Sequence, residues 1–102
     1  MNPKVVVVGF LRFPPYKMSE ILPQLEALLK ATRMHDGCIA YDAAEDPFDR
    51  GVIRFSEVWP DHESLDSHLK APHILPWREA VRRGGLMERN FTAYDIAGSW
   101  AM

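Results

Sequence analysis

The sequence predicts an α+β protein whose elements follow the order βαββαβ and whose four strands form one antiparallel sheet. Short runs of β-branched and aromatic residues alternate with segments whose apolar residues recur at helical spacing. A brief turn-rich stretch separates the second and third of these runs, too short for the crossover that parallel strands need. Together these observations predict helices packed on an antiparallel sheet.

Residues Lys4–Phe13 form the first predicted strand. The run from Val5 to Val8 is β-branched without interruption, so both faces of this strand are apolar. Such a strand is typical of the middle of a sheet that is covered on both sides. Pro14 and Pro15 end it, because proline cannot donate a hydrogen bond to a neighbouring strand.

Residues Ser19–His35 form the first predicted helix. Its apolar residues recur every three or four positions and share one face: Ile21, Leu25, Leu28, Leu29 and Thr32. Ser19 is a candidate N-cap. Pro23 is tolerated only in the first helical turn, which predicts a start a few residues after Ser19. Gly37 follows as the expected left-handed stop.

Residues Cys38–Glu45 and Val52–Trp59 form the second and third predicted strands, joined by the turn-forming sequence of residues 46–51. We expect them to make an antiparallel hairpin. Alternation along the third strand gives it two faces, Ile53, Phe55, Glu57 and Trp59 on one and Val52, Arg54, Ser56 and Val58 on the other. An acid between two aromatic residues indicates either a binding site or an ion pair.

Two short helices and a last strand follow. Asp61 is the predicted N-cap of a helix that continues to Lys70. A second helix is predicted from Pro76, which suits the first helical position, to Arg83. Residues Leu86–Ile96 form the fourth predicted strand and include β-forming aromatic residues.

This order is the ferredoxin-like plan, and residues 1–102 are predicted to make one domain. The helices then cover only one face of the sheet. Because the first strand is apolar on both faces, we expect a second subunit to cover the other face. The C-terminal residues 97–102 have no charged side chain and are predicted to dock against protein.

Charge and composition exclude several classes of function. The chain has 12 basic and 14 acidic residues without a like-charged block, so it lacks the electrostatic footprint of a nucleic-acid-binding protein. The apolar run near its start is too short for a signal peptide or a membrane span. Cys38 is the single cysteine, which excludes an internal disulfide and a thiolate zinc cluster and predicts a reducing, cytoplasmic location.

Three titratable residues are candidate catalytic groups: His68, His73 and Glu57. Histidine titrates near neutral pH and suits proton transfer. His68 lies beside apolar helix positions and His73 at the break between two helices, but each could equally be a packed or capping side chain. Glu57 could orient a histidine, bind a phenolic hydroxyl, or pair with Arg12 or Arg54 across the sheet.

Five further residues are candidate ligand-binding groups: Tyr41, Phe55, Trp59, Trp77 and Arg54. An apolar cavity with few polar groups is the usual container for a small aromatic ligand, and the alternative for each aromatic residue is a place in the core. We expect no metal site, because His62, His68 and His73 lack a common ligand spacing.

Several of these motifs resemble the antibiotic biosynthesis monooxygenase (ABM) family. The residues that carry the resemblance are Gly37-Cys38 with Tyr41, Glu57 with Trp59, and Leu65-Asp66-Ser67-His68-Leu69 followed by Pro72-His73. The resemblance implies a homodimer in which two sheets pack into a dimeric α+β barrel, with C-terminal segments reaching over the partner. It also implies a pocket between the sheet and the helices of each subunit.

Members of that family include cofactor-independent quinol and anthrone monooxygenases. The resemblance therefore implies oxidation of an aromatic or quinol-like small molecule with O2 and without metal or flavin. A non-catalytic module that binds a small ligand, or a non-redox enzyme such as an isomerase, remains an alternative. A basic residue beside an apolar cavity suits each of these functions as well as it suits a monooxygenase. A haem-degrading branch uses an asparagine on the first strand, which residues 4–13 lack.

Overall fold

The computed structural model describes residues 2–102. In chain order its elements are β1 (Val5–Arg12), the 3₁₀ turn η1 (Pro15–Lys17), α1 (Met18–His35), β2 (Ala40–Glu45), β3 (Val52–Trp59), α2 (His62–Leu69), α3 (Ile74–Arg83) and β4 (Glu88–Asp95). The predicted βαββαβ order is confirmed, and β3 has the predicted bounds. None of the described helices is long and apolar enough to span a membrane.

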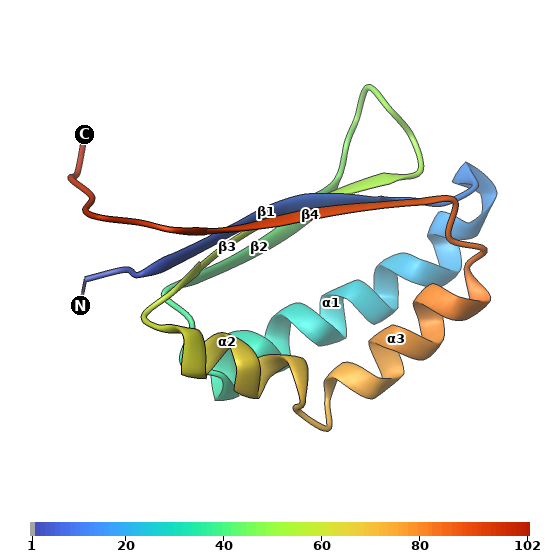
Figure 1. Ribbon diagram of the computed structural model, residues 1–102. Coiled ribbons are helices and arrows are strands. Elements are labelled where there is room, and N and C mark those ends of the chain that lie inside the picture. The colour runs from blue at the N-terminus through green and yellow to red at the C-terminus, as the bar shows by residue number, and fades with distance from the viewer. Residues whose placement is uncertain (1) are drawn as a thin grey trace.

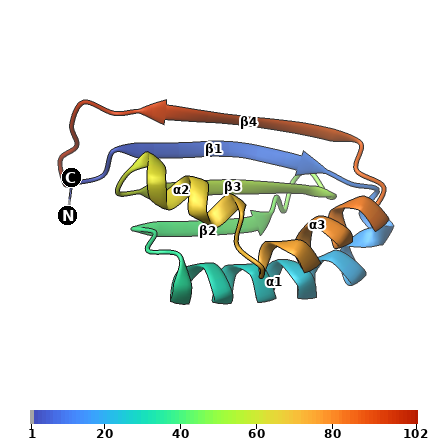
Figure 2. The ribbon, with the colours of Figure 1, turned by 60° about the horizontal axis from the view of Figure 1, so that its bottom comes forward.

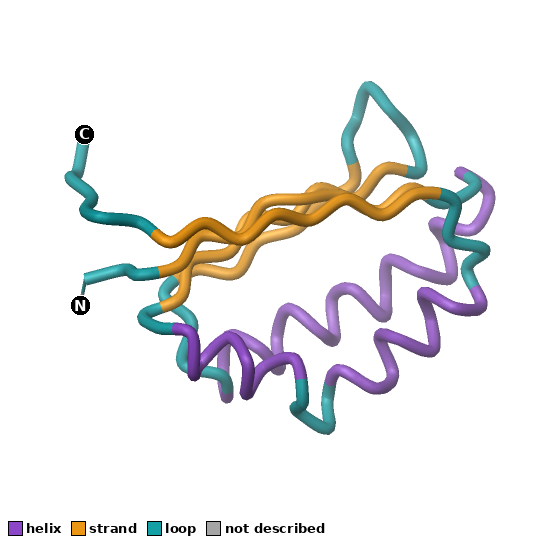
Figure 3. Tube along the Cα trace, in the orientation of Figure 1, coloured by secondary structure: helices purple, strands orange, loops and turns teal. Residues whose placement is uncertain are grey.

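The four strands form one sheet in the order β2-β3-β1-β4, and every neighbouring pair is antiparallel. β2 and β3 make the predicted hairpin, with Tyr41 opposite Glu57. Figure 1 shows the helices packed beneath one face of the sheet, and the Cα trace in Figure 3 shows none of the described helices on the opposite face. The ferredoxin-like prediction is therefore confirmed.

The helices cover the sheet unevenly. Figure 2 looks toward the helices and shows β4 outermost, clear of the helical layer. The residues of β4 are exposed along its length, except for the half-buried Phe91. The sheet and the helices therefore pack closely on the β2 and β3 side and less closely toward β4.

The core forms where α1 packs onto the sheet. The residues of β3 that were predicted to share a face are all buried under the helices: Ile53, Phe55, Glu57 and Trp59. The predicted α1 stripe is buried as well, except for the half-buried Leu29. Each fully buried large apolar side chain contributes roughly 1.5–3 kcal/mol to folding, so this layer fixes the helices on the sheet.

α1 starts one residue before the predicted Ser19 and ends at His35 as predicted, but the later start inferred from Pro23 is wrong. The helix begins at Met18, so Pro23 lies inside it and not in its first turn. Pro23 has no N–H to donate to the carbonyl of Ser19, but both residues are exposed, so water can bond that carbonyl. Met18 and Ile21 are buried in the core, and this packing outweighs the local cost of the proline.

Candidate active site

The two histidines predicted as catalytic groups meet at one carboxylate. His68 Nδ1 lies 2.7 Å from Asp36 Oδ2, and His73 Nε2 lies 2.8 Å from the same oxygen. The side chains of Asp36 and His68 are almost fully buried, and that of His73 is 22% exposed. We call these three residues the Asp36 cluster.

Each member of the Asp36 cluster is placed by a helix end. Asp36 is the C-cap residue of α1, and Gly37, with a φ of 72°, turns the chain there as predicted. His68 lies in the last turn of α2, whose predicted N-cap, Asp61, accepts a hydrogen bond from the backbone. His73 is the N-cap residue of α3. The cluster therefore depends on where three helices begin and end.

Asp36 was not among the residues predicted for the site. A carboxylate at the C-terminal end of a helix is electrostatically unfavourable. The position of Asp36 at the end of the first helix was therefore the one signal in the sequence that a hydrogen-bond donor stabilises its charge. That partner is distant in the chain, because His68 and His73 follow Asp36 by 32 and 37 residues.

The environment of His68 suits a general base. Burial lowers the pKa of His68, and the hydrogen bond to Asp36 opposes part of this shift. The imidazole is then neutral at neutral pH, and because Nδ1 donates to the carboxylate, the lone pair lies on Nε2. Within residues 2–102 no group hydrogen-bonds that nitrogen, and His68 lines a cavity.

Glu57 and Tyr41 line the same cavity from the sheet. Burial raises the pKa of Glu57, and the hydrogen bond that Trp59 Nε1 donates to Glu57 Oε1 at 3.0 Å opposes this shift. Burial also raises the pKa of Tyr41, and the nearby Glu57 adds to the effect. Both side chains are thus biased toward protonated forms that can donate hydrogen bonds to a ligand oxygen.

The ion pair considered for Glu57 does not form. Arg12 bonds to Asp49 at 3.0 Å, and Arg54 bonds to Asp46 at 2.9 Å. Both arginines are therefore engaged by acids of the β2–β3 connection, and Glu57 faces the helices with Trp59 as its bonded neighbour. The reason is the strand alternation, which places Glu57 on the opposite face of β3 from Arg54.

The cavity has a volume of about 360 Å³ and lies between the sheet and the helices α2 and α3. Most of its wall is aromatic or aliphatic. The ring centroid of Phe55 lies 5.3 Å from that of Phe91 and 6.2 Å from that of Trp77, and the Tyr41 and His68 centroids are 5.1 Å apart. Such a wall with few polar groups fits a flat, largely apolar molecule.

Residues 4–80 match the family described as antibiotic biosynthesis monooxygenase. This protein belongs to the ABM family. The match covers most of the chain and confirms the resemblance found in the sequence.

Two relatives are similar to this chain in sequence, and one solved structure is similar to it in fold. The "Putative monooxygenase Rv0793" of Mycobacterium tuberculosis is 33% identical over 88 residues, which cover 86% of this chain and 83% of that protein. An uncharacterised protein of Synechocystis is 30% identical over 70 residues, or 69% of this ABM chain, which spans about half of that relative's length (48%). The crystal structure of a candidate antibiotic biosynthesis monooxygenase from Deinococcus radiodurans has a TM-score of 0.86 at 23% identity, covering 96% of this chain and 97% of that one.

The site residues predicted for this ABM protein fall into separate groups. Five of them line the cavity: Tyr41, Phe55, Glu57, His68 and Trp77. Trp59 was predicted to contact a ligand but is 0% exposed and does not line the cavity; its ring centroid lies 5.0 Å from that of His68. His73 does not line the cavity either, and it belongs to the site only through its hydrogen bond to the Asp36 carboxylate.

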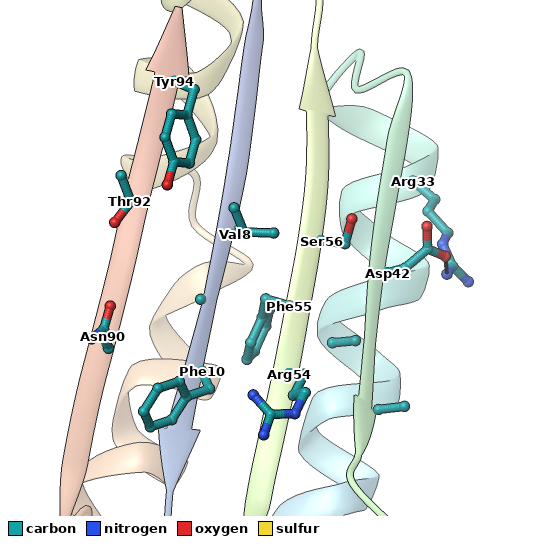
Figure 4. A pocket seen from close by; sticks show the side chains of 13 residues that line it. Val8, Phe10, Arg33, Asp42, Arg54, Phe55, Ser56, Asn90, Thr92 and Tyr94 are labelled. Carbon is teal, nitrogen blue, oxygen red and sulfur yellow. Dashed lines mark hydrogen bonds and ion pairs between the residues drawn. The ribbon is translucent and has the colours of Figure 1, made fainter. Parts of the chain in front are cut away.

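Arg54 was predicted as a ligand-binding residue with Tyr41 and Phe55, and this prediction is corrected. Figure 4 views the face of the sheet opposite the helices and shows Arg54 there beside Phe10. The guanidinium lies 5.7 Å from the Phe10 ring centroid. This open face bears a broader hollow of about 680 Å³, but the Asp36 cluster lies on the other side of the sheet, so we place the candidate active site in the smaller cavity.

The Asp36 cluster also offers a set of metal ligands. Its three donor atoms lie within 4.8 Å of one another, and two imidazoles with a carboxylate suit zinc or iron. Ligand atoms around a tetrahedral zinc ion are about 3.3 Å apart, whereas the Asp36 oxygen lies 2.7 and 2.8 Å from the two nitrogens. The spacing fits hydrogen bonds better than a preformed ion site, and the expectation of no metal site stays a prediction.

Proposed function

We propose that this ABM protein is a monooxygenase that oxidises an electron-rich aromatic molecule, a quinol or an anthrone, with O2 and without metal or flavin. The observation that carries the proposal is the Asp36–His68 hydrogen bond, which orients a buried imidazole beside an aromatic-walled cavity. Family membership and the name of the mycobacterial relative support oxygenation as the class of reaction.

In the proposed reaction, His68 Nε2 removes a proton from the substrate, either from a phenolic hydroxyl of a quinol or from the reactive carbon of an anthrone. The lowered pKa of His68 keeps the imidazole neutral and able to accept this proton. The Asp36 carboxylate then stabilises the imidazolium through Nδ1. The substrate becomes an anion, which gives an electron to O2 much more readily than the neutral molecule does.

The oxygen chemistry balances without a further reductant. The substrate radical and the superoxide combine into a peroxide on carbon, and loss of water leaves a carbonyl group. For an anthrone, one methylene group and one O2 molecule yield one carbonyl group and one water molecule. For a quinol, the ring C–H and the deprotonated hydroxyl supply the two hydrogen atoms of the water, and the product is a hydroxyquinone. The proton held by His68 leaves in that water. Tyr41 and Glu57, both biased toward their protonated forms, donate hydrogen bonds to the oxygen atoms that carry negative charge.

The proposal includes a cytoplasmic homodimer that forms through the open face of the sheet. Figure 4 shows Val8, Phe10 and Tyr94 on this face, and Val8 and Tyr94 are 42% and 52% exposed. An exposed apolar surface of this kind marks a site of protein association, and a second copy of the same chain would cover it. The unpaired thiol of Cys38 accords with a reducing compartment.

Oxygen uptake by the purified protein, assayed for residual metal and flavin, tests the proposal with a panel of hydroquinones and anthrones. We expect uptake that falls by a factor of about 10² or more in His68→Ala. His62→Ala is the matched control, because His62 lies on the same helix, is exposed, and pairs with Asp95 outside the cavity. Ligand binding without oxygen uptake for any compound of the panel would contradict the proposal and favour a binding module.

A further inference from the structure

Two arginines lie at the rim of the cavity. Arg78 projects from α3 and Arg89 from β4, and both line the cavity while remaining exposed to solvent. Neither takes part in an ion pair within residues 2–102. Arg78 Nη2 donates to Leu69 O at 2.6 Å, and the Arg89 guanidinium lies 5.0 Å from the ring centroid of Phe91. Both keep N–H donors available to a ligand.

The other charges of the cavity do not neutralise these two cations. Among the lining residues that the structure describes, Glu57 is the one carboxylate, and its burial disfavours the charged form. Asp36 lies outside the lining, where its carboxylate bonds to two imidazoles. Because the whole chain carries a net charge of −2, the positive rim is a local feature, and a low-dielectric cavity wall strengthens its attraction for an anion.

We propose that the substrate of this protein carries a carboxylate, which Arg78 and Arg89 bind while the aromatic rings enter the cavity. The inference rests on the proposed function and adds the class of substrate to the same site. The planar guanidinium matches a carboxylate through two parallel hydrogen bonds. Arg78 belongs to the helical layer and Arg89 to the sheet, so the carboxylate would bind between the two layers. This contact would fix the orientation of the ring system beside His68.

Each arginine also has a structural role to be distinguished from substrate binding. Arg78 bonds to a carbonyl in the last turn of α2, and Arg89 covers the ring of Phe91. If these contacts were the whole role of the two arginines, their substitution would weaken the binding of charged and neutral ligands alike. Carboxylate recognition predicts a loss confined to the charged ligand.

Two unreactive probes of nearly equal shape test the inference: anthraquinone-2-carboxylate and anthraquinone-2-carboxamide. Their binding is measured by calorimetry and by quenching of tryptophan fluorescence. No turnover is involved, so failure of this inference is distinguishable from failure of the proposed oxygenation. We expect the carboxylate to bind at least about tenfold more tightly than the amide, with a preference that weakens as salt is added.

Substitutions assign the preference to the two arginines. Arg78→Gln and Arg89→Gln are each expected to remove most of it while leaving the affinity for the amide unchanged. Arg82→Gln is the matched control, because it removes a positive charge from α3 at a residue that pairs with Glu79 and does not line the cavity. If circular dichroism shows that a glutamine variant is unfolded, the corresponding lysine variant replaces it. Lysine keeps the positive charge but lacks the planar guanidinium, so we expect the lysine variant to lose part of the preference for the carboxylate. Equal affinity for the two probes, including no binding of either, or an equal loss for both in the variants, would overturn the inference.

Discussion

His68 Nδ1 and Asp36 Oδ2 lie 2.7 Å apart, although 32 residues separate them along the chain. The hydrogen bond joins the end of α2 to the end of α1, and both side chains are almost fully buried. A carboxylate in this place fixes the tautomer and the orientation of the imidazole. In the proposed reaction Asp36 is therefore a positioning residue, and it acts through His68.

We expect Asp36→Asn to lower kcat by a factor of about 10² with little change in KM. The amide keeps the size of the side chain but cannot stabilise an imidazolium. Because Asp36 raises the pKa of His68, its loss should also move the acidic limb of the pH–rate profile, where His68 becomes protonated, to lower pH. Oxygen uptake measured across the neutral range gives both quantities.

The matched control for this variant is Asp42→Asn. Asp42 is exposed on β2 and pairs with Arg33 at 2.8 Å on the far side of the sheet from the cavity. Its substitution should leave both kcat and the pH profile as they are. If Asp36→Asn behaves in the same way, His68 does not depend on the carboxylate and the assigned role of Asp36 is wrong.

The fold was predictable because its signals are local. Strict alternation from Val52 to Trp59 gave the exact bounds and the buried face of β3, and Asp61 and Gly37 marked the helix ends they were predicted to mark. The later start of α1 that Pro23 suggested is wrong, because tertiary packing of Met18 overrides this local signal.

The candidate site was predictable only in part, because its geometry is set by tertiary contacts. Strand alternation was enough to place Phe55 on the helix-facing side of the sheet. The hydrogen bonds from His68 and His73 to Asp36 join the ends of three helices, and no local pattern predicts such contacts. Arg54 is a different case. Its position between Ile53 and Phe55 already placed it on the other face of β3, so the alternation alone could have removed it from the list of cavity residues.

Glu57→Gln should become more stable relative to the natural protein as the pH rises. Folding raises the pKa of Glu57 above its ordinary value of 4.5, so the folded state keeps this proton to a higher pH than the unfolded state does. The contribution of Glu57 to stability is complete below the unfolded pKa and is lost as the pH rises through the folded pKa. Glutamine keeps an acceptor for Trp59 Nε1 and has no such loss.

Urea unfolding of the natural protein and the Glu57→Gln variant at mildly acidic and mildly alkaline pH measures this difference. Glu26→Gln is the control, because Glu26 is exposed on α1 and pairs with Lys30 at 3.8 Å. A difference in the free energy of unfolding between Glu57→Gln and the natural protein that does not change with pH would show that Glu57 is equally charged in both states.

Gly9→Ala should destabilise the fold by about 1–3 kcal/mol, because it overfills the contact between β1 and β4. A Cβ atom at Gly9 would collide with Asn90 O and would lie 2.6 Å from Cδ1 of Phe91. Phe91 lines the cavity, so ligand affinity should fall as well. The control is Gly98→Ala, since nothing lies within 4 Å of the added Cβ there. Equal urea midpoints for the two variants would show that β4 shifts away at no cost.

Val8→Lys should convert the proposed dimer into a monomer. Val8 is 42% exposed on the open face, where its β1 position lies opposite Ser56 of β3 and Thr92 of β4. An ammonium group buried between two sheets without a partner is strongly unfavourable. Sedimentation equilibrium should therefore report twice 11.7 kDa for the natural protein and 11.7 kDa for the variant. Leu75→Lys, at a residue 61% exposed on α3, should remain dimeric. A natural protein that sediments as a monomer at micromolar concentration would contradict the homodimer.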